Sequence, residues 1–124
     1  MITTCILCPR GCRLTIDEKD PHTVTGNACP RGAIWGRVEV TAPVRTLTAT
    51  CAVTLPAGMD APARRVPVRT SGPVPKDAVI DLARELTSIK LSLPVFAGDV
   101  VIDNWRNSGV SVLVTRSLDV CTKN

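Results

Sequence analysis

Four cysteines stand close together in the N-terminal part of the 124-residue chain. Three of them, Cys5, Cys8 and Cys12, lie in the stretch CILCPRGC, and Cys29 follows in NACPRG. The spacing is therefore C-x2-C-x3-C-x16-C. In a reducing compartment, cysteines at such spacing are typical of metal sites or redox groups rather than of structural disulfides.

The first interpretation is a 4Fe–4S cluster, because each of its four iron corners takes one thiolate. The short loop from Cys5 through Cys8 to Cys12 can supply three thiolates, and Cys29 can supply the fourth. Gly11 allows the loop to turn sharply. A proline follows both Cys8 and Cys29, and its fixed backbone angle stiffens the chain where it leaves the site.

Two other interpretations stay open. A structural zinc ion with four thiolates is the main alternative, although zinc ligands usually come as two pairs and these divide three and one. His22 could replace one thiolate, but it lies in a polar turn and is expected to be a solvated loop residue. A redox dithiol of Cys5 and Cys8 is the third interpretation. That motif belongs between a strand and a helix, and no strand is predicted before residue 5.

Other charged and thiol side chains have weaker claims to function. Arg10 and Arg31 each follow a Cys-Pro step. They would either raise the reduction potential of an anionic cluster, dock an acidic partner surface, or serve only as solvated charges. Cys51 is expected to be a small core residue, and Cys121 an exposed thiol without a role. No catalytic constellation is evident, so the chain is not expected to catalyse a reaction alone.

Composition excludes several classes of function. The net charge of +4 is scattered and aromatic content is only 2%, so a nucleic-acid interface is not expected. No apolar run approaches the roughly 20 residues of a membrane-spanning helix, so membrane insertion is not expected. The N-terminal stretch lacks the regions of a signal peptide. The predicted location is therefore the cytoplasm.

Short elements must bring the cysteines together. RLTI (13–16) and TVTG (23–26) are predicted as two strands joined by the polar turn 17–22. Such a hairpin would return Cys29 to the side of the first three cysteines. Pro30 suits the first position of a helix, and a short helix is predicted over 31–39.

The rest of the chain predicts a mixed domain. Residues 44–55 alternate between apolar and polar side chains and are predicted as a strand, as are 66–70, 98–105 and 110–116. A loop is expected over 56–65, and RNSG is expected to form a hairpin turn between the last two strands. Apolar side chains recur at helical spacing through 76–89, which predicts a helix there. The fold class is therefore α+β, with a cysteine-rich lobe (1–41) before a compact domain with one main helix (42–124).

The cysteine-rich segment resembles the cluster lobe of molybdopterin oxidoreductases. In those enzymes C-x2-C-x3-C is followed, after a long gap, by Cys-x-Lys/Arg-Gly, which Cys29, Arg31 and Gly32 match here. The resemblance implies that the four cysteines ligate a cluster and that the basic residue helps electrons to pass. The gap is shorter here and the remaining chain is too short to hold a pterin, so the resemblance implies a site of this type and not that enzyme.

A longer resemblance covers nearly the whole chain. The stretches CILCPRGCRL, VTGNACPRGAIWGRVE, PVRTLTAT, VPVRTSGPVPKDAV and LPVFAGDVVIDN resemble a family of small bacterial and archaeal proteins with paired CxxC cysteines, the domain-of-unknown-function family numbered 1667. Members often accompany FAD-dependent dehydrogenases resembling anaerobic glycerol-3-phosphate dehydrogenase. The resemblance implies a redox or assembly partner of a flavoenzyme, with no catalytic residue to carry over.

Two functions follow as hypotheses. The first is a small 4Fe–4S electron-transfer or accessory subunit of a flavin-dependent dehydrogenase, docked through residues 42–120. The alternative is a zinc-binding interaction module without a redox role, in which the metal only folds the N-terminal lobe.

Overall fold

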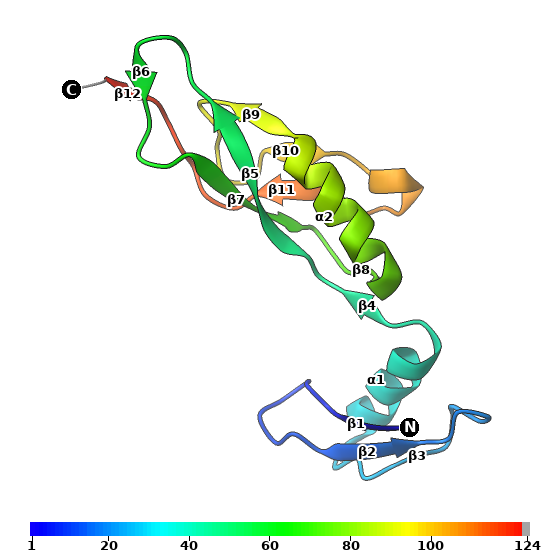
Figure 1. The fold of residues 1–124 in the computed structure, drawn as a ribbon. Coiled ribbons are helices and arrows are strands. Elements are labelled where there is room, and N and C mark those ends of the chain that lie inside the picture. Colours follow the sequence, from blue (N-terminus) through cyan, green and yellow to red (C-terminus); the bar gives the residue numbers. More distant parts are fainter. Residues whose placement is uncertain (123–124) are drawn as a thin grey trace. The chain divides into compact units, whose positions relative to one another are not determined.

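The computed structural model describes residues 1–122 and forms two compact units, Met1–Val44 and a second that begins at Arg45 (Figure 1). Each unit combines a helix with a sheet around its own hydrophobic core. The predicted α+β class is therefore confirmed. No helix among the described residues is long and apolar enough to cross a membrane.

The sheet of the first unit is a three-stranded antiparallel meander, formed by β1 (Ile2–Thr4), β2 (Arg13–Ile16) and β3 (Val24–Thr25) in that order. The strands predicted at 13–16 and 23–26 are confirmed. The expectation that no strand precedes Cys5 is wrong, because β1 ends at the residue before it. Even so, Cys5 and Cys8 lie in a loop and not at the start of a helix, so the dithiol context is incomplete.

The predicted polar turn at 17–22 is confirmed and is built by two aspartates. The Asp17 carboxylate accepts the Lys19 N–H at 2.9 Å, and the Asp20 carboxylate accepts the Thr23 hydroxyl at 2.8 Å. The Thr23 hydroxyl, and after it the His22 N–H, lower the pKa of the exposed Asp20. His22 is exposed at this turn, as predicted.

Helix α1 (Pro30–Thr41) begins at the predicted proline and extends slightly beyond the predicted range. Its buried Gly36 faces β2, where a Cβ would lie 3.1 Å from Ile16 Cδ1 and 3.2 Å from Leu14 Cδ1. Leu14 and Ile16 are fully buried, and Trp35 packs against the same core. The absence of a side chain at Gly36 therefore lets the helix lie close against β2.

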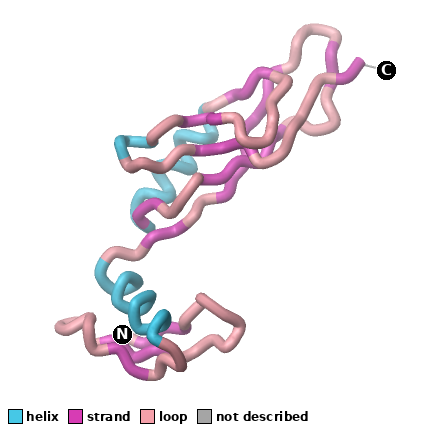
Figure 2. Tube along the Cα trace, turned by 180° about the vertical axis from the view of Figure 1, so that it is seen from behind, coloured by secondary structure: helices cyan, strands magenta, loops and turns pink. Residues whose placement is uncertain are grey.

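The second unit contains a five-stranded sheet with α2 (Val79–Ser88) against one face (Figures 1 and 2). A single 3-10 turn, η1 (Lys76–Ala78), precedes the helix. The strand order is β10-β11-β7-β5-β9, antiparallel except for the parallel pair β5–β9. The five strands are β5 (Thr48–Thr54), β7 (Arg65–Thr70), β9 (Lys90–Ser92), β10 (Val100–Ile102) and β11 (Val112–Val114).

The core of this unit confirms the two strongest periodic patterns. Leu82 and Leu86 of α2 are buried against β5, where Cys51 is fully buried. Burial raises the pKa of the Cys51 thiol, and the nearby charge of Arg65 opposes this rise. The thiol lies 3.8 Å from the Leu86 carbonyl oxygen. Cys51 is thus a core residue, as predicted.

Several short strands depart from the predictions. The strand predicted over 44–55 is divided into β4 (Val44–Arg45) and β5, and the loop predicted over 56–65 contains β6 (Met59–Asp60). β6 pairs with β12 (Cys121–Thr122), which contains the exposed Cys121. A two-residue strand, β8 (Val74–Pro75), precedes η1.

The turn between β10 and β11 is wider than the predicted hairpin. Strand β10 ends at Ile102, not at residue 105, because Asn104 takes a left-handed backbone (φ 44°). A 3-10 turn, η2 (Trp105–Asn107), follows, and Arg106 within it is also left-handed (φ 48°). The Asn104 side-chain oxygen accepts the Gly109 N–H at 2.8 Å and closes the turn.

Trp105 fastens this turn to helix α2. Its side chain is buried, and its Nε1–H donates to Glu85 Oε2 at 2.7 Å. The Arg106 guanidinium lies 4.6 Å from the Trp105 ring centroid and pairs with Glu85 Oε1 at 2.9 Å. A longer contact of 3.8 Å joins Arg106 to Asp81. Glu85 therefore accepts hydrogen bonds from two consecutive residues of the turn, Trp105 and Arg106.

Glu85→Ala is expected to lower the free energy of unfolding of the second unit by about 1–3 kcal/mol, because the indole N–H of Trp105 loses its acceptor. Asp81→Ala is the matched control. It removes only an exposed ion pair and should cost at most about 1 kcal/mol. Urea unfolding followed by fluorescence measures both, and equal losses in the two variants would contradict the role given to Glu85.

Candidate metal centre

The four clustered cysteines line one pocket in the first unit. Its volume is about 200 Å³. Besides Cys5, Cys8, Cys12 and Cys29, its lining residues are Leu7, Arg10, Ala28, Arg31 and Gly32. The structure therefore brings together all four thiols that the spacing singled out, and both arginines that follow Cys-Pro. His22, the possible substitute ligand, does not line the pocket.

The loop that carries three of the thiols is closed by the β1–β2 hairpin. The pair Thr4 and Arg13 ends the ladder, so Cys5 and Cys12 are the next residues on the two sides. The Cys5 N–H donates to the Cys12 carbonyl at 2.8 Å. Gly11 takes a left-handed backbone (φ 63°) just before Cys12, which a residue with a side chain rarely adopts. Sheet pairing thus holds two of the three thiol-bearing residues at the base of the loop.

The fourth thiol belongs to the residue that begins helix α1. Cys29 is the N-cap, with an extended backbone (φ −145°, ψ 160°). Its carbonyl accepts the Asn27 side-chain N–H at 3.1 Å and the Gly32 backbone N–H at 3.2 Å. The helix start therefore sets the position of Cys29 at the pocket.

The environment of Cys29 favours its thiolate. The Gly32 backbone N–H, followed by the Arg31 side chain, lowers the pKa of the Cys29 thiol, while burial acts in the opposite direction. No side-chain hydrogen bond caps the helix. The lowering of the Cys29 pKa therefore comes from backbone N–H dipoles and from a guanidinium close to the sulfur. Helix N-termini and basic neighbours are the usual causes of a lowered thiol pKa, and a thiolate is the form that binds metals.

Gly32 keeps the pocket open beside the buried thiol. It lies in the first turn of α1 and is itself buried. A Cβ there would meet Asn27 Cβ at 3.1 Å and Cys5 Sγ at 3.8 Å. A larger side chain at this position would therefore occupy space next to Cys5. The sequence pointed to Gly32 only through the CPRG step, and nothing in it pointed to Leu7 or Ala28 as lining residues.

Exposure differs among the four thiols. Cys5 is buried, with 7% of its surface exposed, while Cys12 and Cys29 are half-buried and Cys8 is exposed. The pocket is therefore deep at Cys5 and reaches solvent at Cys8.

The thiols share a pocket without converging on one point. Among residues 1–122, no three His, Cys, Asp or Glu side chains are grouped closely enough to hold a single ion. A zinc ion needs every sulfur within about 2.3 Å of its centre. A 4Fe–4S cluster needs each sulfur near a different iron. Four thiols in one pocket are donors of the type that either group takes.

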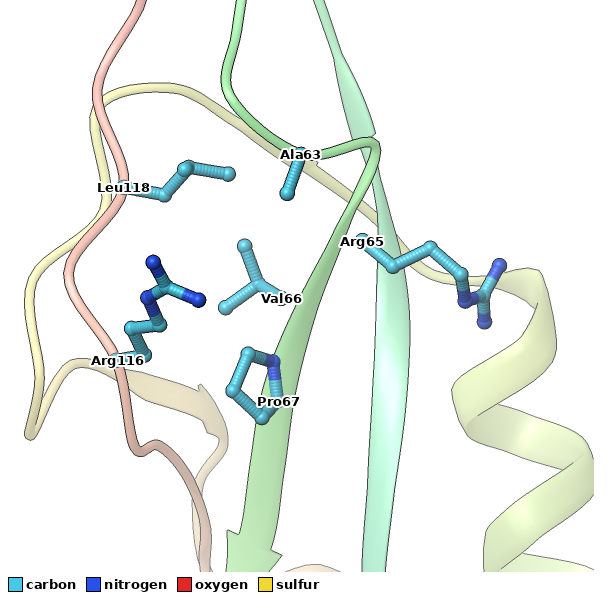
Figure 3. Close-up of a pocket in the computed structure, with 6 residues that line it drawn as sticks. All are labelled: Ala63, Arg65, Val66, Pro67, Arg116 and Leu118. Carbon is cyan, nitrogen blue, oxygen red and sulfur yellow. The ribbon is translucent and has the colours of Figure 1, made fainter.

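A much smaller cavity lies near the sheet of the second unit. Its volume is about 10 Å³, roughly the space that one water molecule needs. Arg65 extends away from it (Figure 3), and its Nε donates to Thr50 Oγ1 at 2.7 Å. The lining residues are Ala63, Arg65, Val66, Pro67, Arg116 and Leu118. Nothing in this lining supplies a set of metal donors.

Comparison with known protein families shows which family the chain belongs to. The profile of the family described as "Protein of unknown function (DUF1667)" matches residues 30–116. The chain belongs to the DUF1667 family. The predicted family resemblance is therefore confirmed. The DUF1667 match begins at Pro30, so the four pocket cysteines precede the matched residues and α1 lies within them.

A solved structure supports the fold of this DUF1667 protein. The NMR structure of Clostridium perfringens protein CPE0013, a structural genomics target, matches with 25% identity and a TM-score of 0.53. The match covers 65% of this chain and 91% of that one. No curated protein matches the chain. The resemblance of the cysteine segment to molybdopterin oxidoreductases stays a prediction.

Proposed function

We propose that this DUF1667 protein is a small cytoplasmic 4Fe–4S accessory subunit that transfers electrons to or from a flavin-dependent dehydrogenase. Cys5, Cys8, Cys12 and Cys29 would hold the cluster. The observation that carries the proposal is the single pocket lined by four free thiols from two separate segments.

The donor set supports a cluster more than a lone zinc ion. Three thiols come from one closed loop, and the fourth comes from the N-cap of α1. A short loop with one remote cysteine is a division that suits a cluster, whereas zinc ligands usually come as two pairs. Six free cysteines, with no disulfide among the described residues, also suit a reducing compartment.

The chemistry that such a group supplies is one-electron transfer. A flavin accepts or donates two electrons, and a one-electron carrier lets these pass singly. This chain's own residues would set how readily that happens. Arg10 and Arg31 line the pocket, and positive charge stabilises the reduced, more negative state of a cluster. We therefore expect the two arginines to raise the reduction potential.

The partner is inferred from the family resemblance. It implies an FAD-dependent dehydrogenase similar to anaerobic glycerol-3-phosphate dehydrogenase, and an accessory role fits a chain in which no catalytic constellation was predicted. No site for a flavin is needed within this chain under the proposal, because the flavin would belong to the larger partner.

Anaerobic purification tests the metal. The protein is expected to be brown, to absorb broadly near ~400 nm as thiolate-ligated iron does, and to bleach with dithionite. Metal analysis should give iron and acid-labile sulfide in equal amounts. A colourless protein with one zinc per chain would overturn the cluster and leave the zinc-stabilised interaction module.

A second measurement tests the partner. A tagged chain is recovered anaerobically from its native cells, and the eluate is denatured and assayed for released FAD. Stoichiometric FAD, co-eluting with one larger polypeptide, is expected. An eluate that holds the coloured chain and no FAD would contradict the flavoenzyme partner while leaving the cluster intact.

A further inference from the structure

We infer that the cysteine pocket is the docking face for the partner, and that it fits an acidic protein surface with an apolar depression at its centre. The inference rests on the proposed function in taking that partner to be a flavoprotein. Its evidence is the separation of charge within the first unit and two exposed apolar side chains at the pocket mouth.

Positive charge gathers at the cysteine end of the first unit. Arg10 and Arg31 line the pocket, and Arg13 directly follows Cys12. All three side chains are exposed, and within residues 1–122 none of them forms an ion pair. The N-terminus of α1, which lies at the same pocket, adds the positive end of a helix dipole.

The opposite end of β2 is weakly acidic. Asp17, Glu18 and Asp20 occupy the turn that follows this strand, and Glu39 lies near the far end of α1. Lys19, Arg37 and the N-terminal ammonium, which pairs with Glu18 at 3.4 Å, offset three of these four negative charges. At about 3.3 Å per residue, the turn begins on the order of 13 Å along the strand from Arg13. That exceeds the Debye length of about 8 Å at physiological salt. An approaching protein therefore meets the basic end as a separate surface.

Two apolar side chains stand out of the same end. Ile6 is 73% exposed and Leu7 44% exposed, and both lie between the ligand candidates Cys5 and Cys8. Apolar groups at the centre with charges at the rim are the usual anatomy of a protein interface. Cys8, which follows Leu7, is also exposed and lines the pocket, so a partner bound here would lie next to the site.

The arginines do more than balance the charge of a bound metal group. Zn²⁺ with four thiolates carries a formal charge of about −2, and an oxidised cluster with four thiolates is similarly anionic. Arg10, Arg13 and Arg31 exceed that charge by one, so the face stays basic when it holds zinc or an oxidised cluster, and becomes neutral when the cluster takes up one electron. Charge complementarity therefore selects an acidic partner surface and repels a basic one.

The test uses oxidised flavodoxin, an acidic flavoprotein, as the probe. Binding of the anaerobically purified full chain to immobilised flavodoxin is measured by surface plasmon resonance at low and high salt. The matched surface is flavodoxin whose carboxylates have been amidated. We expect salt-sensitive binding to the first surface only, weakened at least about tenfold in the double variant R10E/R31E.

Two further variants separate docking from general charge and from metal retention. R84E/K90E makes the same change in net charge with exposed residues of the second unit, and should keep full binding. Ile6→Ser alters an exposed side chain that does not line the pocket, and should weaken binding with metal content unchanged. Equal loss in R84E/K90E, or equal binding to amidated flavodoxin, would overturn the docking face.

The outcomes distinguish this inference from the proposed function. A brown protein that does not bind flavodoxin would reject the docking face and leave the cluster proposal standing. A colourless, zinc-containing protein that binds through Arg10 and Arg31 would do the reverse. Metal content is measured for every variant. If R10E/R31E loses both metal and binding while Ile6→Ser binds normally, the result counts against the docking face.

Discussion

Cys29→Ser is expected to remove most of the bound metal while the second unit stays folded. Cys29 is the one thiol in the pocket that comes from outside the Cys5–Cys12 loop, and the surroundings of the pocket lower its pKa. Loss of an outer-shell partner typically costs about 10–100-fold in metal affinity, so loss of a direct ligand should cost at least as much. Iron, zinc and sulfide per chain measure the effect.

Cys121→Ser is the matched control for that substitution. Cys121 is an exposed free thiol in β12, far along the sequence from the pocket residues. The same chemical change there should leave metal content at the wild-type level. Full metal in Cys29→Ser would show that Cys29 is not a ligand, and a comparable loss in Cys121→Ser would show that the loss is not specific to the pocket.

Gly26→Ala is expected to disrupt the first unit as a whole. Gly26 follows β3 and has a left-handed backbone (φ 86°), and a Cβ built there would fall on the carbonyl oxygen of Arg13 in β2. A side chain in the left-handed region alone costs roughly 1–2 kcal/mol. The overlap with backbone adds to that, because β2 and β3 must move apart. Cys29, three residues later, would then lose its place, and metal should be lost with it.

Gly58→Ala is the control that separates the effect of steric overlap with the backbone from the effect of left-handed backbone strain. Gly58 has nearly the same backbone (φ 79°), but nothing lies within 4 Å of a Cβ built there. It should therefore cost only the roughly 1–2 kcal/mol of strain and keep its metal. The indole N–H signals of Trp35 and Trp105 report the two units separately by NMR. A dispersed Trp35 signal and normal metal content in Gly26→Ala would contradict the expectation.

Elements that bury one regular face were predictable from the sequence. The apolar spacing of α2 places Leu82 and Leu86 in the core, and the alternation along β5 does the same for Cys51. In both cases side-chain periodicity and burial have the same origin, so the pattern alone locates the element. The ends were less predictable, since residues 76–78 form a 3-10 turn.

Strands of two or three residues could not be predicted in this way. β1 and β9 are too short to show a period, and each is defined by its partner. β9 pairs with β5 through Ala52 and Lys90, which are far apart in the sequence. β6 exists because β12 lies beside it. Such strands depend on tertiary pairing, which a local pattern does not express.

The end of β10 shows the same limit at a turn. Nothing in the local pattern indicates that Asn104 and Arg106 take left-handed backbones. Acceptors supplied by Glu85, on a helix about 20 residues earlier, hold the turn through Trp105 and Arg106. Backbone strain of this kind persists where surrounding contacts outweigh it.

For the candidate metal centre, the sequence predicted which cysteines share the pocket and not their surroundings. Spacing and the hairpin were enough to expect Cys29 beside Cys5, Cys8 and Cys12, which share one pocket. Pro30 indicated a helix start, but the role of Cys29 as its N-cap, and the effect of Gly32 on its pKa, depend on the three-dimensional position of the first helical turn.

The order of the strands along the chain has a consequence for how the protein is made. All four pocket cysteines precede every strand of the five-stranded sheet, and that sheet needs Val114 before β11 is complete. At about 5–20 residues per second, a ribosome takes on the order of 4–17 s to add residues 30–114. The pairs of the first sheet are close in sequence and form early. The unit that contains the four pocket cysteines can therefore fold while the second unit is still being synthesised.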